Sequence, residues 1–496
     1  MTEIPDPLSS WVRRQRWYAG KGGAARLGLA GSITLAEGDG WTIRILVIRD
    51  SGDRPALYQV PISQYRERPS ELEAALIGTM AEGPESPGPE SPGAGSTGIE
   101  SEGTPPGARD RRHWYDAPRD PRFAAALLGL MLDGRRAGPA PGSPLTAQGR
   151  AAPGWPGGPV RLLSGTVLEV DQSNTSIVCA LGDAAERPAG ESAQAPPPLI
   201  LKVFRMLAEG ENPDVVLQSA LAAAGSRHVP RPAGQVQGRW PRADGSLASG
   251  HLAFAQEFLP DARDGWRLAF RAAADGEDFA EQAADLGRAT ADVHEMLART
   301  LPSRSAEAAD IAATVAGMRR RLAEAESDAP AIADRHDAIE AVIAGTAGLE
   351  WPRLQRIHGD YHLGQVLATA KGWMLIDFEG EPHRPLAERT QPDLHLRDIA
   401  GMMRSFDYVG ANLRLAEPGR RTEDWVRSAQ QGFLRGYAER SGQDPQRYAE
   451  LLRAFVLDKA LYELSYEARH RPDWQEIPLQ AVRRLSAGAD DPPDAP

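Results

Sequence analysis

The chain has 496 residues, of which 41% are hydrophobic, so it has room for about two to four domains with buried cores. Its 56 basic and 68 acidic side chains give a net charge of −12, which argues against broad nucleic-acid binding because a polyanion needs a basic face. The single cysteine, Cys179, excludes an internal disulfide and disfavours a cysteine-based zinc site.

Neither a secretory leader nor a membrane span is expected. The first residues lack a long apolar segment, and no run of about 18 apolar residues occurs in the chain. We therefore expect a soluble, cytoplasmic protein that does not bind membranes.

The N-terminal part is predicted to contain helices, strands and an insert. Ser9–Tyr18 is expected to be a helix, and the apolar runs Trp41–Ile48 and Ala56–Pro61 are typical of strands. Pro69–Met80 is predicted to be helical again, with a proline in its first turn. Residues 83–109 repeat GPESP in tandem and are predicted to be disordered, because they cannot bury enough apolar surface.

The next part is predicted to be mostly β-structure. A helical pattern, FAAALLGLML, lies within His113–Gly134, and the Gly/Pro-rich residues 136–159 are predicted to be a linker. A further polar, Pro-rich patch covers Gly182–Pro198. Apolar runs predict four strands, at Val160–Val170, Ser176–Ala180, Leu199–Phe204 and Leu252–Phe258.

From Asp278 onward the period changes to that of amphipathic helices. Helices are predicted over 278–301, 306–326, 331–346, 396–416, 423–440, 446–469 and 478–487. A mostly β part is therefore followed by a mostly α part.

The residues best suited to chemistry lie in Arg356–Pro382, which reads RIHGDYHLGQVLATAKGWMLIDFEGEP. Asp360 can accept a hydroxyl proton, and Gln365 with Asp377 can hold Mg²⁺ against the phosphates of a nucleotide. Asp360 could instead cap a helix, and Asp377 could be a turn residue. His358 is predicted to be structural.

Two other features in the β part favour phosphate binding. Lys202 stands within the apolar strand LILKVF and needs an anion if that strand is buried; a lysine at a sheet edge is the alternative. Asp171–Ser176 offers hydroxyls and backbone amides, although it contains no glycine. Within Arg356–Pro382, a solvated surface role is predicted for Glu381.

Several short strings of the sequence, taken together, are typical of one family. They are QRWYAGK from Gln15, YQVP from Tyr58, DQSNTS from Asp171, ILKVF from Ile200, GSRHV from Gly225, IHGD from Ile357, IDFEGEP from Ile376, RDIAGMMRSFDY from Arg397, LDK from Leu457 and YEAR from Tyr466. In these strings the chain resembles bacterial maltokinases, which are sugar kinases of the aminoglycoside-phosphotransferase-like family; glucosamine kinases are close relatives. The resemblance covers nearly the whole chain except the Pro/Gly-rich inserts.

The resemblance implies an α+β, bilobal protein-kinase-like fold. It assigns an N-terminal cap subdomain of mixed α/β structure, a linker, a β-rich nucleotide-binding lobe and a helical lobe carrying the catalytic and sugar site, at 1–135, 136–159, 160–260 and 261–496. The implied reaction is transfer of the ATP γ-phosphate to the anomeric hydroxyl of maltose, in carbohydrate metabolism and glycogen biosynthesis. Association with a maltose-producing or maltose-1-phosphate-using enzyme is a further partner hypothesis.

Site residues carried over from the resemblance fall into four groups. Asp360 is the base, Gln365 and Asp377 bind Mg²⁺, and Lys202 positions phosphate. The phosphate loop is Gln172, Ser173, Asn174 and Thr175, and the adenine hinge is Glu257, Phe258 and Leu259. The sugar site combines Arg404, Asp407, Tyr408, Tyr462, Glu463 and Tyr466.

Two departures from the family pattern leave alternatives open. Val216 stands where a glutamate usually pairs with the strand lysine, and Glu209, Glu211 or Asp214 could replace it. The string QPDLHL from Gln391 differs beside the expected sugar site, so glucosamine stays open as the substrate. The acids Asp393, Asp398 and Asp407 are available for an amino group. A nucleotide-binding scaffold without activity is the alternative from another class of function.

Overall fold

The computed structural model describes residues 2–81, 111–138, 144–155, 160–169, 174–183, 196–242, 244–381 and 384–487. The chain divides into two compact units. The first unit comprises Met1–Val215 with Arg231–Phe258, and the second comprises Val216–Pro230 with Leu259–Pro496. The insert predicted at residues 83–109 lies outside the described residues.

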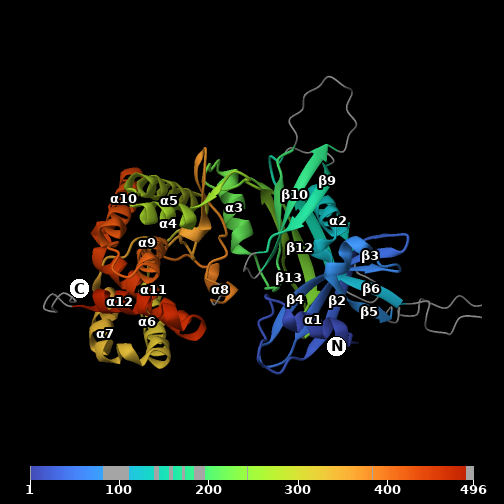
Figure 1. Ribbon diagram of the computed structural model, residues 1–496, viewed down its shortest axis with the longest axis horizontal. Coiled ribbons are helices and arrows are strands. Elements are labelled where there is room, and N and C mark those ends of the chain that lie inside the picture. Colours follow the sequence, from blue (N-terminus) through green and yellow to red (C-terminus); the bar gives the residue numbers. More distant parts are fainter. Residues whose placement is uncertain are drawn as a thin grey trace, which may run out of the picture. The chain divides into compact units, whose positions relative to one another are not determined.

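The first unit begins with a six-stranded antiparallel sheet in the order β1-β2-β3-β4-β6-β5 (Figure 1). Its strands are β1 (Thr2–Glu3), β2 (Leu27–Gly38), β3 (Trp41–Asp50), β4 (Ala56–Tyr65), β5 (Leu76–Ala81) and β6 (Arg111–Asp116). Helix α1 (Asp6–Arg14) buries Leu8 and Val12, which lie four residues apart on one face. The predicted first helix and the two predicted strands of this region are therefore confirmed.

The second helix predicted for this region is wrong. Ser70–Ala75 forms only a short 3₁₀ turn, and Leu76–Ala81 is strand β5. Ile77, Gly78 and Thr79 are poor helix formers. β6 pairs with these residues from a distant point in the sequence, and a local pattern cannot reveal such a partner.

A second, seven-stranded sheet follows in the order β7-β8-β12-β13-β11-β10-β9. Its strands are β7 (Arg136–Ala137), β8 (Thr146–Ala151), β9 (Val160–Val167), β10 (Thr175–Asp183), β11 (Leu199–Val203), β12 (Pro232–Pro241) and β13 (Leu247–Glu257). Helix α2 (Pro121–Leu132) buries Phe123, Leu127 and Met131 in the same core as this sheet. The four strands predicted here are present as β9, β10, β11 and β13.

Strand β8 lies within the stretch predicted to be a linker. It pairs with β12 from Thr146, opposite Arg239, to Ala151, opposite Gly234. Its sequence, TAQGRA, shows no clear alternation of apolar and polar residues. At Gly149 a Cβ atom would lie 1.9 Å from the carbonyl oxygen of Leu130, so this glycine allows α2 to pack closely on the sheet.

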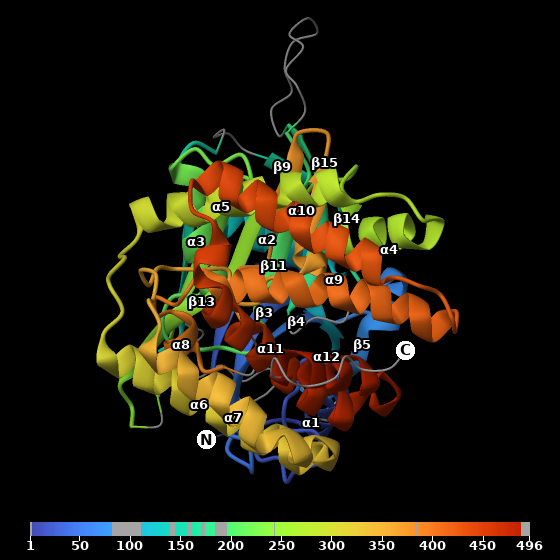
Figure 2. The ribbon, with the colours of Figure 1, turned by 90° about the vertical axis from the view of Figure 1, so that its left-hand side faces the viewer.

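The second unit is mainly helical (Figure 2). After α3 (Pro213–Ala223), in which the division between the units falls, its helices are α4 (Gly265–Asp275), α5 (Ala280–Thr300), α6 (Ala308–Asp328), α7 (His336–Gly345), α8 (Leu386–Arg389), α9 (Leu396–Ala416), α10 (Glu423–Ser441), α11 (Ala449–His470) and α12 (Glu476–Ser486). A small antiparallel sheet contains β14 (Arg263–Asp264), β15 (Val366–Thr369) and β16 (Gly372–Leu375). The predicted helices of this part are confirmed, whereas α3 and α4 were not predicted.

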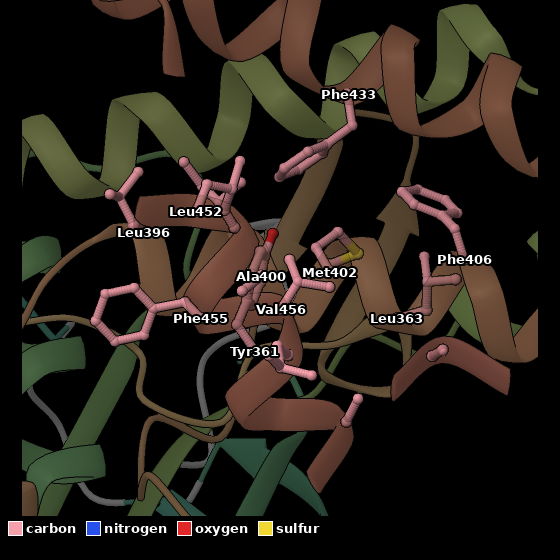
Figure 3. Packing of buried hydrophobic residues seen from close by; sticks show 14 of the residues in the cluster. Tyr361, Leu363, Leu396, Ala400, Met402, Phe406, Phe433, Leu452, Phe455 and Val456 are labelled. Atoms are coloured by element: carbon pink, nitrogen blue, oxygen red, sulfur yellow. The ribbon is translucent and has the colours of Figure 1, made fainter. Parts of the chain in front are cut away.

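The core of the second unit directly supports the segment that carries Asp360. Tyr361 and Leu363, which follow Asp360, are buried among residues of α9, α10 and α11 (Figure 3). The Tyr361 hydroxyl also shares a 2.8 Å hydrogen bond with Thr290 of α5. The loop that carries Asp360 is therefore anchored in the helical core.

Among the described helices, none combines the length and the apolar character needed to cross a lipid bilayer.

Candidate active site

A single carboxylate of α9 holds the loop that carries Asp360. Asp398 accepts hydrogen bonds from the backbone N–H groups of His358 and Gly359, at 2.8 Å each, and contacts Nε2 of His294 at 2.9 Å. The Asp398 side chain is only 1% exposed. Burial alone would raise the pKa of Asp398, but His294 and the loop amides outweigh it and the pKa is lowered. Asp398 therefore stays ionised and fixes the loop.

His358 is structural, as predicted. Its Nδ1 accepts the backbone N–H of Asp360 at 3.4 Å, and its Nε2 donates to the carbonyl oxygen of Ile376 at 2.9 Å. Its ring lies 4.6 Å from the ring of Phe378. These contacts connect the two aspartate-bearing parts of the segment.

Asp360 does not cap a helix. The following 3₁₀ turn, Leu363–Gln365, is capped by the ring of His362, which accepts the N–H of Gly364 at 3.0 Å. The Asp360 carboxylate instead meets the ammonium group of Lys459, at 3.2 Å. It is therefore available for a role in chemistry.

Gln365 and Asp377 lie together at the open end of the β15–β16 hairpin. Gln365 comes directly before β15, and Asp377 follows β16. The Gln365 amide nitrogen is 3.3 Å from Oδ2 of Asp377. Asp377 has a φ of 67°, and it is the only residue other than glycine with a positive φ among the described residues. Strain of this kind is retained where the surrounding structure needs the side chain in one direction. Asp377 offers a carboxylate and Gln365 an amide oxygen, and Mg²⁺ takes both as ligands, so the pair predicted for that role is a suitable donor set.

His362 lies close to both predicted reactive aspartates. Burial has the largest effect on its ring and lowers its pKa, while Asp360 and Asp377 each act in the opposite direction. The structure thus brings Asp360, Gln365 and Asp377 into one region of the second unit.

Lys202 of β11 is buried in the first unit and paired. Its side chain is 7% exposed, and its Nζ contacts Oδ2 of Asp214 at 2.8 Å. Asp214 lies at the start of α3 and is fully buried. Of the three acids that could replace the missing glutamate, Asp214 is therefore the one that does so, and the alternative of an exposed edge lysine is excluded.

The predicted nucleotide loop is described only in part. Gln172 and Ser173 lie outside the described residues, whereas Asn174 and Thr175 precede and begin β10. Oγ1 of Thr175 accepts a 2.8 Å hydrogen bond from Nε of the buried Arg205. In the predicted hinge, the backbone N–H groups of Glu257 and Phe258 donate to Arg231 and Pro198, both at 2.8 Å, and Leu259 begins the next part of the second unit.

The predicted sugar residues form two adjoining groups on α9 and α11. Arg404 is 1% exposed; its Nη2 lies 2.7 Å from Glu463 and its Nη1 lies 2.7 Å from Asp407. Its guanidinium also lies over the ring of Tyr408. Arg404 is therefore a buried connection between α9 and α11. Tyr462 belongs to the group around Lys459, whose Nζ lies 4.9 Å from the centre of its ring.

All three acids considered for an amino sugar are already engaged, Asp407 by Arg404 as described above. Asp393 contacts Arg397 at 2.9 Å and Arg384 at 3.3 Å, and Asp398 holds the catalytic loop. Glu467, near Tyr408 and Tyr466, was not considered. It is 2% exposed, its Oε1 accepts from Tyr408 at 3.2 Å and from Arg471 at 2.7 Å, and its Oε2 has no hydrogen-bond partner among the described residues.

Two further residues were missed in the sequence. The motif strings include Lys459 but assign it no role. The surface role predicted for Glu381 is wrong, because Glu381 is 7% exposed and contacts Lys459 at 2.8 Å. The available signal was the Asp458-Lys459 pair inside an otherwise apolar run of α11, since buried charges need partners.

Comparisons with known proteins show the family to which the chain belongs. Residues 198–451 match the family model for the phosphotransferase enzyme family, and residues 11–87 match the maltokinase N-terminal cap domain. A glucosamine kinase of Streptacidiphilus jiangxiensis is 31% identical over 349 residues, which cover 62% of this chain and 70% of that protein. A glucosamine kinase of Mycolicibacterium smegmatis is 29% identical over 339 residues, covering 64% and 78%.

Solved structures show the same fold. A glucosamine kinase in complex with glucosamine, ADP and inorganic phosphate aligns with a TM-score of 0.61 and 24% identity, covering 98% of this chain and 100% of that one. Another glucosamine kinase structure, crystal form B, aligns with a TM-score of 0.62 and 23% identity, covering 96% and 99%. The chain belongs to the phosphotransferase enzyme family, and its β-rich part and helical part form the kinase-like fold of that family. It is a kinase-type phosphotransferase, as the motif strings predicted.

Proposed function

We propose that the chain is an ATP-dependent sugar kinase, with glucosamine as the first candidate substrate and Asp360 as the general base. The observation that carries the proposal is the placement of Asp360 beside the Gln365–Asp377 pair, on a loop and hairpin fixed by Asp398 and His358. Positioning and charge stabilisation supply most of the catalysis in phosphoryl transfer, so a rigid arrangement of these groups suits that reaction.

Each side chain has a definite task in this reaction. Asp360 accepts the proton of the acceptor hydroxyl as that oxygen bonds to the γ-phosphorus of ATP, and ADP leaves with the bridging oxygen. Gln365 and Asp377 would hold Mg²⁺, which neutralises developing charge on the phosphate oxygens. Lys202, kept in place by Asp214, would bind nucleotide phosphate.

Two features support glucosamine. The two relatives and the two solved structures described above are glucosamine kinases. In addition, Oε2 of the buried Glu467 has no donor in the part of the chain that the structure describes, and a buried acceptor without a donor costs free energy until a ligand supplies one. An ammonium group satisfies a carboxylate better than a hydroxyl does, because the hydrogen bond is charge-assisted.

Maltose is the second candidate, since residues 11–87 match the cap domain of maltokinases. The direct test is a coupled assay of ADP release with Mg²⁺-ATP and, in turn, glucosamine, maltose, glucose and an aminoglycoside. Glucosamine is expected to give the highest kcat/KM. A higher value for maltose would reverse the choice of sugar, and no turnover with any sugar would overturn the proposed activity.

A variant of Glu467 tests amine recognition separately. Glu467→Gln keeps the shape of the side chain and removes its charge, so KM for glucosamine should rise by about tenfold or more while KM for ATP stays within about twofold. Equal effects on glucosamine and glucose would show that Glu467 does not read the amino group.

A further inference from the structure

One ammonium group is shared by two carboxylates of the catalytic segment. Nζ of Lys459, on α11, lies 3.2 Å from Oδ1 of Asp360 and 2.8 Å from Oε1 of Glu381. The two carboxylates therefore lie no more than about 6 Å apart, a distance at which like charges repel strongly in a buried site. The family resemblance assigns no role to Lys459 or Glu381.

Lys459 and Glu381 are both charged over the physiological range. Burial opposes the charge on Lys459, but Glu381 first and then Asp360 outweigh it and raise its pKa. Burial likewise opposes the charge on Glu381, yet Lys459 and then Arg397 lower its pKa to about 2. Lys459 therefore remains a cation, and Glu381 remains an anion beside it.

Lys459 is also fixed by its own helix. The preceding residue, Asp458, receives two hydrogen bonds from Arg321 of α6, at 2.5 and 2.6 Å, and one from Arg397 of α9, at 3.3 Å. On the other side Nζ lies over the ring of Tyr462. These contacts set the rotation of α11 at this point. The ammonium group of Lys459 is therefore held toward Asp360.

We propose that Lys459 is a positioning residue for the general base, with Glu381 holding the lysine in place. The inference rests on the proposed function, because it gives Asp360 the role of base. The ammonium group engages Oδ1 of Asp360 and leaves Oδ2 for the acceptor hydroxyl. It also lies between the Asp360 and Glu381 carboxylates and offsets the repulsion between them.

Of the two contacts of Lys459, the one with Glu381 is shorter than the one with Asp360, and this difference bears on where the lysine stays during the reaction. When the acceptor oxygen bonds to phosphorus, its proton moves to Oδ2 of Asp360, and the bond from phosphorus to the bridging oxygen of ADP breaks. Asp360 is then neutral and its attraction for Lys459 falls. The lysine keeps the shorter contact with Glu381, so it stays in place and keeps its own protons.

The groups that face Asp360 define the pH experiment. They are Lys459, Glu381, His362 and Tyr462, with Arg321 and Arg397 beyond them. In Lys459→Met the chain loses the cation and keeps a side chain of similar length. In Lys459→Arg the charge is kept. In Glu381→Gln the second carboxylate is removed.

The test measures kcat and KM of the full chain with Mg²⁺-ATP and glucosamine from pH 5 to 9. Lys459→Met should lower kcat about 100-fold, keep KM for ATP within about threefold, and move the acid limb of the kcat profile upward by about one pH unit or more. Lys459→Arg should recover at least about a tenth of the wild-type kcat. The double variant Lys459→Met/Glu381→Gln should return the acid limb toward its wild-type position, because Asp360 no longer faces a second anion.

A purely structural lysine would give a different pattern. It would lower the melting temperature and the active fraction without moving the acid limb, and Glu381→Gln would then worsen the defect. An unmoved limb in Lys459→Met, with wild-type turnover intact, overturns this inference alone. Absence of sugar phosphorylation by the wild type overturns the proposed function and this inference with it.

If Lys459→Met does not fold, Glu381→Gln decides the matter. With Glu381 neutral, the ammonium charge acts on Asp360 alone, so the acid limb should move to lower pH. A shift to higher pH would overturn the inference.

Discussion

Asp360, which contacts Lys459, is the residue on which the proposed chemistry depends most. Asp360→Asn keeps the size of the side chain and removes its basicity. We expect kcat to fall about 100- to 10,000-fold, the range typical of a lost general base, while the Kd for ATP changes little. Steady-state kinetics and calorimetric titration of the nucleotide measure the two effects.

A matched control is Asp334→Asn, because Asp334 is exposed on the same unit. Its activity should equal that of the wild type. Turnover by Asp360→Asn within about tenfold of wild type would reject Asp360 as the base.

Asp377 allows stability and function to be separated at one position. Its φ of 67° suits glycine, which adopts this region without strain, whereas alanine does not. Both Asp377→Gly and Asp377→Ala should lose Mg²⁺-dependent nucleotide binding. The glycine variant should be more stable than the alanine variant by about 1 kcal/mol in urea unfolding. Equal stability of the two variants would show that the backbone at this position is not strained.

At the scale of elements, α5 and α10 pack through glycines that admit backbone contact. A Cβ atom on Gly436 would lie 1.9 Å from the carbonyl oxygen of Ala284, and one on Gly287 would lie 2.1 Å from that of Phe433. Figure 2 shows the two helices side by side. Their approach fixes the position of Thr290, whose hydroxyl contacts Tyr361, the residue after Asp360.

Gly436→Ala should therefore separate the two helices and destabilise the chain by about 1 to 3 kcal/mol. Gly317→Ala on α6 is the matched control, because its Cβ would meet nothing closer than 3.6 Å. Alanine is the better helix former, so that variant should gain about 0.5 to 1 kcal/mol. Chemical unfolding of both variants tests the pair, and a neutral Gly436→Ala would contradict the packing argument.

At the scale of the whole molecule, buried neutral histidines should make stability depend on pH. Burial lowers the pKa of His251, in the first unit, to about 4. Burial and then the neighbouring ring of His294 lower the pKa of His395, in the second unit, to about 3. His251 is neutral in its contacts, since Nδ1 accepts the N–H of Asn212 and Nε2 donates to Gln235.

The sign follows from proton uptake. Between pH 6.5 and about 4 the unfolded chain binds protons at these rings and the folded chain does not, so the free energy of unfolding falls on acidification. Each ring accounts for a few kcal/mol, as about 1.4 kcal/mol goes with each unit of pKa. Glu381 adds a further loss from about pH 4.5 toward 2, because its folded pKa is the lower one.

Urea unfolding from pH 7.5 to 4.5 measures this dependence. His251→Gln removes one titrating ring and should flatten the curve over this range. An increase in stability on acidification, or an unchanged slope in His251→Gln, would contradict the assignment of neutral buried rings.

Local patterns in the sequence determined much of this protein. The helical spacing of apolar residues over 396–416 predicted a helix, and α9 has the same bounds. An amphipathic helix repeats its apolar face along the chain, so a local pattern reveals it. Lys202, Asp360, Gln365 and Asp377 could also be selected from the sequence, since a charge inside an apolar strand or at a strand end needs a partner or a task. The family followed from the same strings.

Only the tertiary structure decided which charges meet. Lys459 lies 99 positions from Asp360, and Asp398 lies 40 positions from His358, so no local period connects them. The partner of Lys202, the strand β8 and the buried state of Glu381 were likewise settled by segments that come together on folding. The physical reason is that helix and strand patterns arise from neighbours in the chain, whereas buried ion pairs and sheet partners arise from contacts between distant segments.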